Sequence, residues 1–154
     1  SPVFASGTLF VVHPSSKLQS IRPDGSRDVS KTHLGWIAED GIPDVTGPVS
    51  NGELVFLIDS GGTLTCYDAA NGKKQWTHDL EEDFNASPSI AGNRLYLVSK
   101  KGTVIVIDAA REFKELGQSP LGEEVFASPA FAQNRIFVRG MKHLFCIGAK
   151  NTNP

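Results

Sequence analysis

A segment of about 40 residues recurs along the chain, and this repeat constrains the fold more than any other feature of the sequence. Four dipeptides begin similar segments at spacings of 46, 40 and 41 residues: Ser1-Pro2, Gly47-Pro48, Ser87-Pro88 and Ser128-Pro129. After each dipeptide come a turn, an apolar run, a second turn and a second apolar run. A fixed period of this size is typical of repeat architectures, in which each unit packs against its neighbours.

The apolar runs predict β-strands. They are too short for helices and rich in Val, Ile, Leu, Phe and Tyr, as in Leu54–Ile58 and Val104–Ile107. Asn51-Gly52 between two such segments is a strong hairpin signal. Because the runs are continuous rather than alternating, both faces of each strand should be buried. Sheets that stack face to face around an axis meet this condition, and a repeat of about 40 residues with about four strands has the size of a propeller blade.

We therefore predict an all-β fold, a β-propeller segment of about three and a half four-stranded antiparallel blades. Proline at the start of each repeat suits an innermost edge strand, because proline cannot donate to a ladder. The expected organisation is a single partial domain with repeats 1–46, 47–86, 87–127 and 128–148 and a tail at 149–154. The last repeat ends without an outermost strand. A two-sheet sandwich remains the structural alternative.

Composition excludes several classes of function. With 40% apolar and 21% charged residues the chain resembles an ordinary soluble globular protein. A net charge of -2 gives no basic surface of the kind that nucleic acid or an anionic membrane requires. No apolar run approaches the roughly 18 residues of a membrane-spanning helix, so we expect no membrane insertion. The four histidines lie in different repeats without chelating spacing, so no metal ligand is assigned.

Residues 66–76 resemble a known motif. The segment Cys-Tyr-Asp-Ala-Ala-Asn-Gly-Lys-Lys-Gln-Trp is similar to the tryptophan-docking motif of pyrroloquinoline-quinone-type (PQQ-like) repeats, Ala-x-Asp-x-x-Thr-Gly-x-x-x-Trp. Asp68, Gly72 and Trp76 match the key positions of that motif. Each also has a physical role in a scaffold: Gly72 can adopt a positive φ, Asp68 can accept hydrogen bonds from the turn, and Trp76 can pack against the neighbouring blade and donate its N–H to a backbone acceptor.

The other repeats match this motif less well. Asp108 keeps the position of the aspartate, but Arg111 stands in the turn and Leu116 is expected at the position of the tryptophan. The first repeat has a distant Trp36 after a longer, irregular segment. We interpret the two recurring aspartates as marks of a structural turn and assign no catalytic residue to the chain.

The resemblance implies two classes of function. Quinoprotein dehydrogenases of this family hold PQQ and calcium over the propeller axis with an adjacent cysteine pair, a stacking tryptophan and an aspartate base. Here Cys66 and Cys146 are far apart in sequence. Other relatives use the repeats to bind proteins. We therefore predict a non-enzymatic recognition scaffold with a protein partner and no cofactor, outside the cytoplasm (periplasmic) as the resemblance implies. A PQQ-dependent dehydrogenase whose catalytic residues lie in a missing half is the alternative.

Two kinds of surface remain as candidates. The links between repeats and the turns between the two apolar runs should share one face of a propeller, where the side chains that approach the axial opening would be Phe84, Asn85, Ser87, Phe126 and Ser128. The two phenylalanines, aligned with each other, are expected mainly to pack between blades. The terminal blade faces should be flat, apolar and open. We therefore expect the C-terminal half of a ring of about seven or eight blades, or an isologous homodimer through the open faces.

Overall fold

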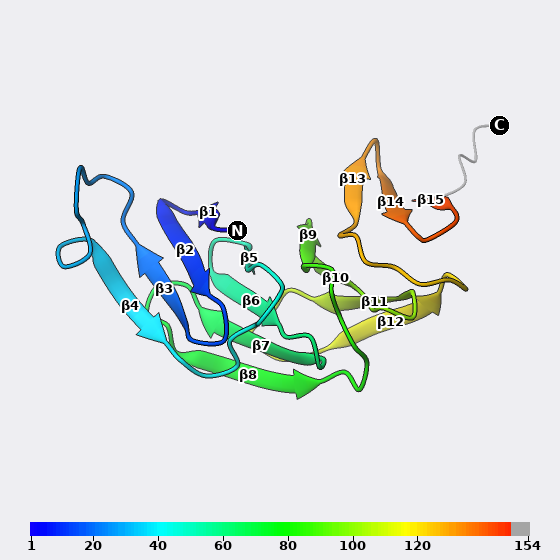
Figure 1. The fold of residues 1–154 in the computed structure, drawn as a ribbon, viewed down its shortest axis with the longest axis horizontal. Coiled ribbons are helices and arrows are strands. Elements are labelled where there is room, and N and C mark those ends of the chain that lie inside the picture. The colour runs from blue at the N-terminus through cyan, green and yellow to red at the C-terminus, as the bar shows by residue number, and fades with distance from the viewer. Residues whose placement is uncertain (149–154) are drawn as a thin grey trace.

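The computed structural model describes residues 1–148, which form four antiparallel sheets in sequence order (Figure 1). Each sheet is one blade, and its strands follow one another from the inside of the arc outward. The prediction of an all-β propeller segment is confirmed. The predicted tail, 149–154, lies outside the described residues. No helix in the described part of the chain has the length and apolar character needed to cross a membrane.

The first two blades have four strands each. Blade 1 consists of β1 (Val3–Ala5), β2 (Thr8–His13), β3 (Lys17–Ile21) and β4 (Leu34–Ala38). Blade 2 consists of β5 (Val49–Ser50), β6 (Leu54–Ile58), β7 (Thr63–Asp68) and β8 (Lys74–Asp79).

Blade 3 repeats this order, whereas blade 4 has three strands among the described residues. Blade 3 consists of β9 (Ser89–Ala91), β10 (Arg94–Val98), β11 (Thr103–Asp108) and β12 (Glu115–Pro120). Blade 4 consists of β13 (Ala130–Ala132), β14 (Arg135–Arg139) and β15 (Leu144–Gly148). A proline directly precedes β1, β5, β9 and β13, the innermost strands, as the edge-strand argument predicted.

The core lies between the blades, in three junctions that we number in chain order. Every residue of β6 is buried, and four of the five residues of β10 are, because both faces of these strands contact a neighbouring blade. The strand register separates the two faces. We call the face toward the following blade the leading face and the opposite one the trailing face. Phe56 of β6, for example, lies on the leading face and packs in the second junction, whereas Val55 lies on the trailing face and packs in the first.

One aromatic position shows the repeat most clearly. Phe10, Phe56, Tyr96 and Phe137 are spaced 46, 40 and 41 residues apart, as the opening dipeptides are. Each lies on the second strand of its blade, on the leading face. The first three are buried in the three junctions. Phe137 has no following blade among the described residues and is only half-buried.

The two ends of the arc therefore expose apolar blade faces. Cross-strand pairing places Phe4, Leu9 and Ile21 on the trailing face of blade 1, where Phe4 is 61% exposed. Phe137 and Cys146 are paired on the leading face of blade 4, and Leu144 of that face is 65% exposed. The residue types match those of the three closed junctions. Among the described residues, neither end face has a blade packed against it.

Candidate functional site

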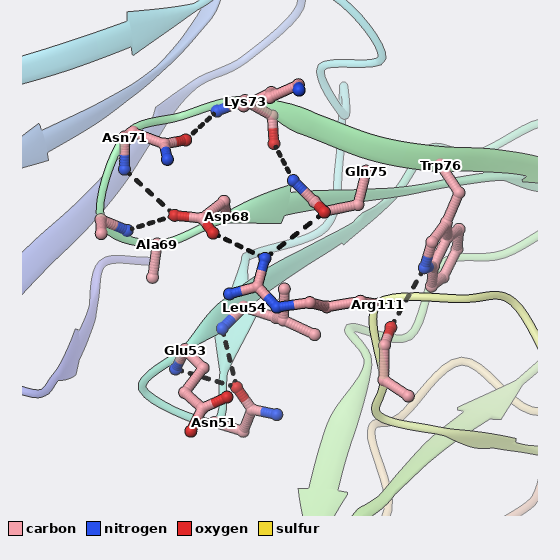
Figure 2. Close-up of polar contacts among 12 residues, drawn as sticks. Asn51, Glu53, Leu54, Asp68, Ala69, Asn71, Lys73, Gln75, Trp76 and Arg111 are labelled. Carbon is pink, nitrogen blue, oxygen red and sulfur yellow. Dashed lines mark hydrogen bonds and ion pairs between the residues drawn. The ribbon is translucent and has the colours of Figure 1, made fainter.

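The docking motif of blade 2 is built as a turn that its aspartate organises (Figure 2). Asp68 Oδ1 accepts hydrogen bonds from the backbone N–H groups of Ala70 (3.0 Å) and Asn71 (3.2 Å). Gly72 has a φ of +71°, in the left-handed region that favours glycine. These are the roles that the sequence predicted for both residues. The recurring Asp108 shapes its own turn through the main chain, because its carbonyl accepts the N–H of Ala110 at 2.9 Å.

Arg111, the residue that departs from the motif in blade 3, links blade 3 to blade 2. Its Nη1 donates to Asp68 Oδ2 at 2.7 Å and contacts Gln75 Oε1 at 3.4 Å. The hydrogen bond from Arg111 is the largest cause that holds the pKa of Asp68 below its ordinary value, and the turn N–H groups act in the same direction against burial. The substitution in the turn therefore creates a contact between blades.

Trp76 of β8 closes the second junction. Its indole N–H donates to the carbonyl of Ala110 at 3.1 Å, and its ring packs against Phe56 and Phe113 with centroids 5.9 and 5.5 Å apart. Trp76 thus lies between blades 2 and 3, with a backbone acceptor for its N–H.

Trp36 docks between blades in the same way in the first junction. The sequence did not lead us to predict this role. Its N–H donates to the carbonyl of Ala69 at 2.9 Å, and its ring packs against Phe10. A Cβ on Gly72 would lie 2.5 Å from the indole, so the docking glycine of blade 2 also makes room for the tryptophan of blade 1. The signal was present in the sequence: Trp36 precedes Trp76 by 40 residues, the length of a repeat. The irregular segment before Trp36 obscured it.

The third junction has no docking tryptophan. Trp76 pairs with Cys66 across the strands, and the same register in blade 3 pairs Gly117 with Val106. Gly117, and not Leu116, therefore occupies the tryptophan position. The expectation for Leu116 was wrong by one residue, because the turn between β11 and β12 is one residue longer than the turn between β7 and β8: the N–H of Asp108 donates to Lys114 O, whereas the N–H of Asp68 donates to Lys73 O. Leu116 is 45% exposed, and a Cβ on Gly117 would meet nothing within 4 Å.

The links between blades and the turns between the second and third strands of each blade lie at one edge of the arc. We call this edge the link face. Phe84 N donates to Ser60 O, and Val125 N donates to Lys100 O, so each link is held by the turn of the preceding blade. These contacts also correct the alignment of the two phenylalanines. Phe84 corresponds to Val125, and both are fully buried. Phe84 is a core residue with no surface for a ligand.

The serines of the repeat dipeptides connect adjacent blades near their innermost strands. Ser87 Oγ accepts the N–H of Gly47 at 2.9 Å, and Ser128 Oγ accepts the N–H of Ser87 at 3.0 Å. Both hydroxyl groups therefore have a structural use. Asn85 is half-buried, and its counterpart in the corrected alignment is Phe126, which is 47% exposed.

The link that carries Phe126 runs along a turn that carries a second exposed apolar residue, Met141. Val125 bridges to Gly140, and Met141 N donates to Glu124 O at 3.0 Å, so the link and the β14–β15 turn run together. Met141 is 59% exposed. Glu123 fixes this turn by accepting the backbone N–H groups of Lys142 (2.8 Å) and His143 (3.0 Å). Burial raises the pKa of Glu123, but these hydrogen bonds outweigh it and hold the pKa below its ordinary value.

The residues present do not fit the quinone site of the dehydrogenases. Cys66 is buried in β7 and Cys146 lies in β15, two blades away. Both tryptophans donate their N–H groups to backbone carbonyls within junctions, away from an axial stacking position. Within residues 1–148 no group of three or more His, Cys, Asp or Glu side chains is placed to hold a metal ion.

Comparisons with known proteins agree with this architecture. A family model described as outer membrane protein assembly factor BamB matches residues 27–112. BamB of Burkholderia pseudomallei strain K96243 is 26% identical over 92 residues, which cover 60% of this chain and 24% of that protein. The chain thus spans about a quarter of that relative's length.

Solved structures show the same fold at low sequence identity. BamB of Moraxella catarrhalis superposes with a TM-score of 0.73 at 14% identity, over 91% of this chain and 39% of that one. A quinohemoprotein alcohol dehydrogenase of Pseudomonas putida HK5 gives 0.71 at 14% identity, over 89% and 27% of the two chains. The computationally designed Ika4 protein gives 0.70 at 14% identity, over 96% and 89%. These identities support the fold alone.

Proposed function

The chain belongs to the PQQ-like repeat family described as outer membrane protein assembly factor BamB, and on that premise we propose that it is a recognition scaffold that binds another protein and performs no chemistry of its own. The motif residues are engaged inside the blade junctions: Asp68, Trp36 and Trp76 hold neighbouring blades together. The repeat therefore supplies a rigid arc, and recognition falls to its surface.

Two exposed apolar residues of the link face, Phe126 and Met141, carry this proposal. Aromatic residues and methionine are enriched at protein interfaces, and the hydrogen bonds between the link and the β14–β15 turn keep their backbone in place. Asn85 and Ser128 extend the same face toward the innermost strands. Phe84 and Ser87 support this surface from within.

We propose a location outside the cytoplasm, and the family description, outer membrane protein assembly factor, supports it. The open trailing face of blade 1 and leading face of blade 4 would be covered by further blades of a ring of about seven or eight. A second copy, arranged as a homodimer that pairs blade 4 of each chain with blade 1 of the other, would meet the same need.

Site-specific photocrosslinking in expressing cells tests the recognition surface. A photoreactive phenylalanine analogue replaces Phe126 or Met141, and a matched control places it at Leu116 of β12, which is 45% exposed and lies away from the link face. We expect one discrete adduct with an envelope protein from positions 126 and 141 and none from position 116. Equal adducts from all three positions, or no adduct from 126 and 141, would contradict the proposal.

The dehydrogenase remains the competing function. The likeness to the Pseudomonas putida enzyme, at 14% identity, supports the shared fold and leaves the activity of this chain to be measured. The positions of both cysteines and both tryptophans are inconsistent with a quinone site formed by this chain.

A further inference from the structure

The first junction contains a pocket at the edge of the arc opposite to the link face. It has a volume of about 350 Å³, within the range of roughly 300–1,000 Å³ typical of small-molecule sites. Thr8, Ser20, Arg22 and Trp36 line it from blade 1, and Asn71 of the β7–β8 turn lines it from blade 2. The strand register places Thr8, Ser20 and Arg22 together on the leading face of blade 1, so all three face the first junction.

Side chains close the equivalent edge of the second junction (Figure 2). Asn51 Nδ2 of blade 2 donates to the carbonyl of Ala109 in blade 3 at 3.1 Å. Arg111 of blade 3 reaches back to Asp68 and Gln75 of blade 2, at 2.7 and 3.4 Å. This edge of the second junction is therefore bridged by three long polar side chains.

Shorter side chains stand at the same positions of the first junction. Gly35 precedes Trp36 as Gln75 precedes Trp76, and strand pairing aligns the turn before β2 with the turn before β6. The counterparts of Asn51, Gln75 and Arg111 are thus Ala5, Gly35 and Asn71. None of the three can span the gap that its counterpart spans, which explains why the first junction is open at this edge.

The two junctions also differ in charge. Arg22 stands at the position of Asp68, and the neutral Asn71 stands at the position of Arg111. Arg22 Nη2 donates to the carbonyl of Thr32 at 2.8 Å, but within the described part of the chain Arg22 forms no ion pair and no carboxylate lines the pocket. The second junction holds a cation together with its anion, whereas the first holds the cation alone.

We propose that this pocket binds a small carboxylate. Arg22 uses one N–H group on Thr32 and keeps others for an anion, for which its planar guanidinium is well suited. Asn71 Oδ1 accepts the N–H of Lys73, so its NH2 group is free to donate to the carboxylate. The apolar body of the ligand lies against the ring of Trp36. This site is separate from the link face and does not depend on the protein recognition proposed there.

Isothermal titration calorimetry of the full chain at constant ionic strength, with three compounds of matched size, tests the site. Butyrate carries the anion, butyramide is neutral and butylamine is a cation. We expect saturable one-site binding of butyrate with a Kd at or below about 1 mM, and binding about tenfold weaker for butyramide and weaker still for butylamine. Absence of saturation, or equal affinity for all three compounds, would refute the proposal.

Variants assign the binding to this pocket. Arg22→Gln should lower the butyrate affinity to that of butyramide. Asn71→Asp, which keeps the size of the side chain, supplies a carboxylate within the pocket and should weaken butyrate binding about tenfold or more. The control Arg27→Gln removes an equal charge from the same β3–β4 connection, outside the pocket, and should change neither affinity. If Arg22→Gln and Asn71→Asp both bind butyrate as the parent chain does, or if Arg27→Gln weakens binding as much as Arg22→Gln, the ligand lies elsewhere and the proposal is wrong.

Discussion

At the scale of single residues, the two docking tryptophans decide how firmly neighbouring blades hold together. Each indole fills a junction and donates one hydrogen bond to the following blade. Trp76→Ala should cost about 3 kcal/mol, the lower end of the range for large-to-small core changes, because the indole is partly exposed. Trp36→Ala should cost a similar amount. Urea unfolding curves measure both, and Trp76→Phe, which keeps a ring, should lose much less. An unchanged midpoint for Trp36→Ala would show that its docking does not stabilise the arc.

The ion pair between Arg111 and Asp68 makes a pH-dependent contribution. Because the folded-state pKa of Asp68 is lowered, its stabilisation is present above the unfolded pKa of about 3.9 and disappears as pH falls through the lower folded value. Arg111→Gln should therefore lower the melting temperature near neutral pH, and the difference from the parent chain should shrink in acid. Melting curves across a pH series measure this. A difference that stays constant into acid would show that Arg111 acts through packing alone.

At the scale of elements, the repeat period and strand chemistry were enough to predict the blades, their order and the docking role of Trp76. The sequence could not show that Gly117 replaces the tryptophan of blade 3, because the turn between β11 and β12 is one residue longer than its counterpart in blade 2. Nor could it show that Phe84 corresponds to Val125, since an adjacent phenylalanine offered a closer match. Trp36 was missed because the long connection between β3 and β4 hid its period. Prediction from the sequence therefore failed where the connection between two elements differs in length or sequence from its counterparts in the other repeats.

The cysteines on the third strands of blades 2 and 4 should differ in their reactivity toward a thiol reagent. Cys66 on β7 is fully buried, and burial raises the pKa of its thiol to about 12. Cys146 on β15 is exposed on the open leading face. Iodoacetamide should therefore modify one thiol per native chain and both after denaturation, as counted by mass spectrometry. In Cys146→Ser the native chain should not react. Rapid modification of Cys66 in the native chain would contradict the closed second junction.

At the scale of the whole molecule, the arrangement favours recognition over quinone chemistry. Both tryptophans belong to junctions, and the two cysteines lie two blades apart. Addition of pyrroloquinoline quinone with calcium should therefore give no saturable absorbance change, and a dye-linked assay should show no oxidation of alcohols or sugars. A quinoprotein dehydrogenase assayed in parallel is the control. Micromolar quinone binding accompanied by turnover would show that the protein is a dehydrogenase and would contradict the scaffold proposal.

The proposed architecture is tested most directly by whether the open faces of blades 1 and 4 pair with another blade. Sedimentation velocity over a concentration series measures this directly. We predict that the chain associates as its concentration rises, because each face buries apolar residues only against another blade. Phe4→Glu places a charge on the trailing face of blade 1 and should prevent association, whereas Val45→Glu, at a residue of equal exposure on a link, should not. A compact monomer at every concentration for all three proteins, with a cooperative melt, would contradict the account.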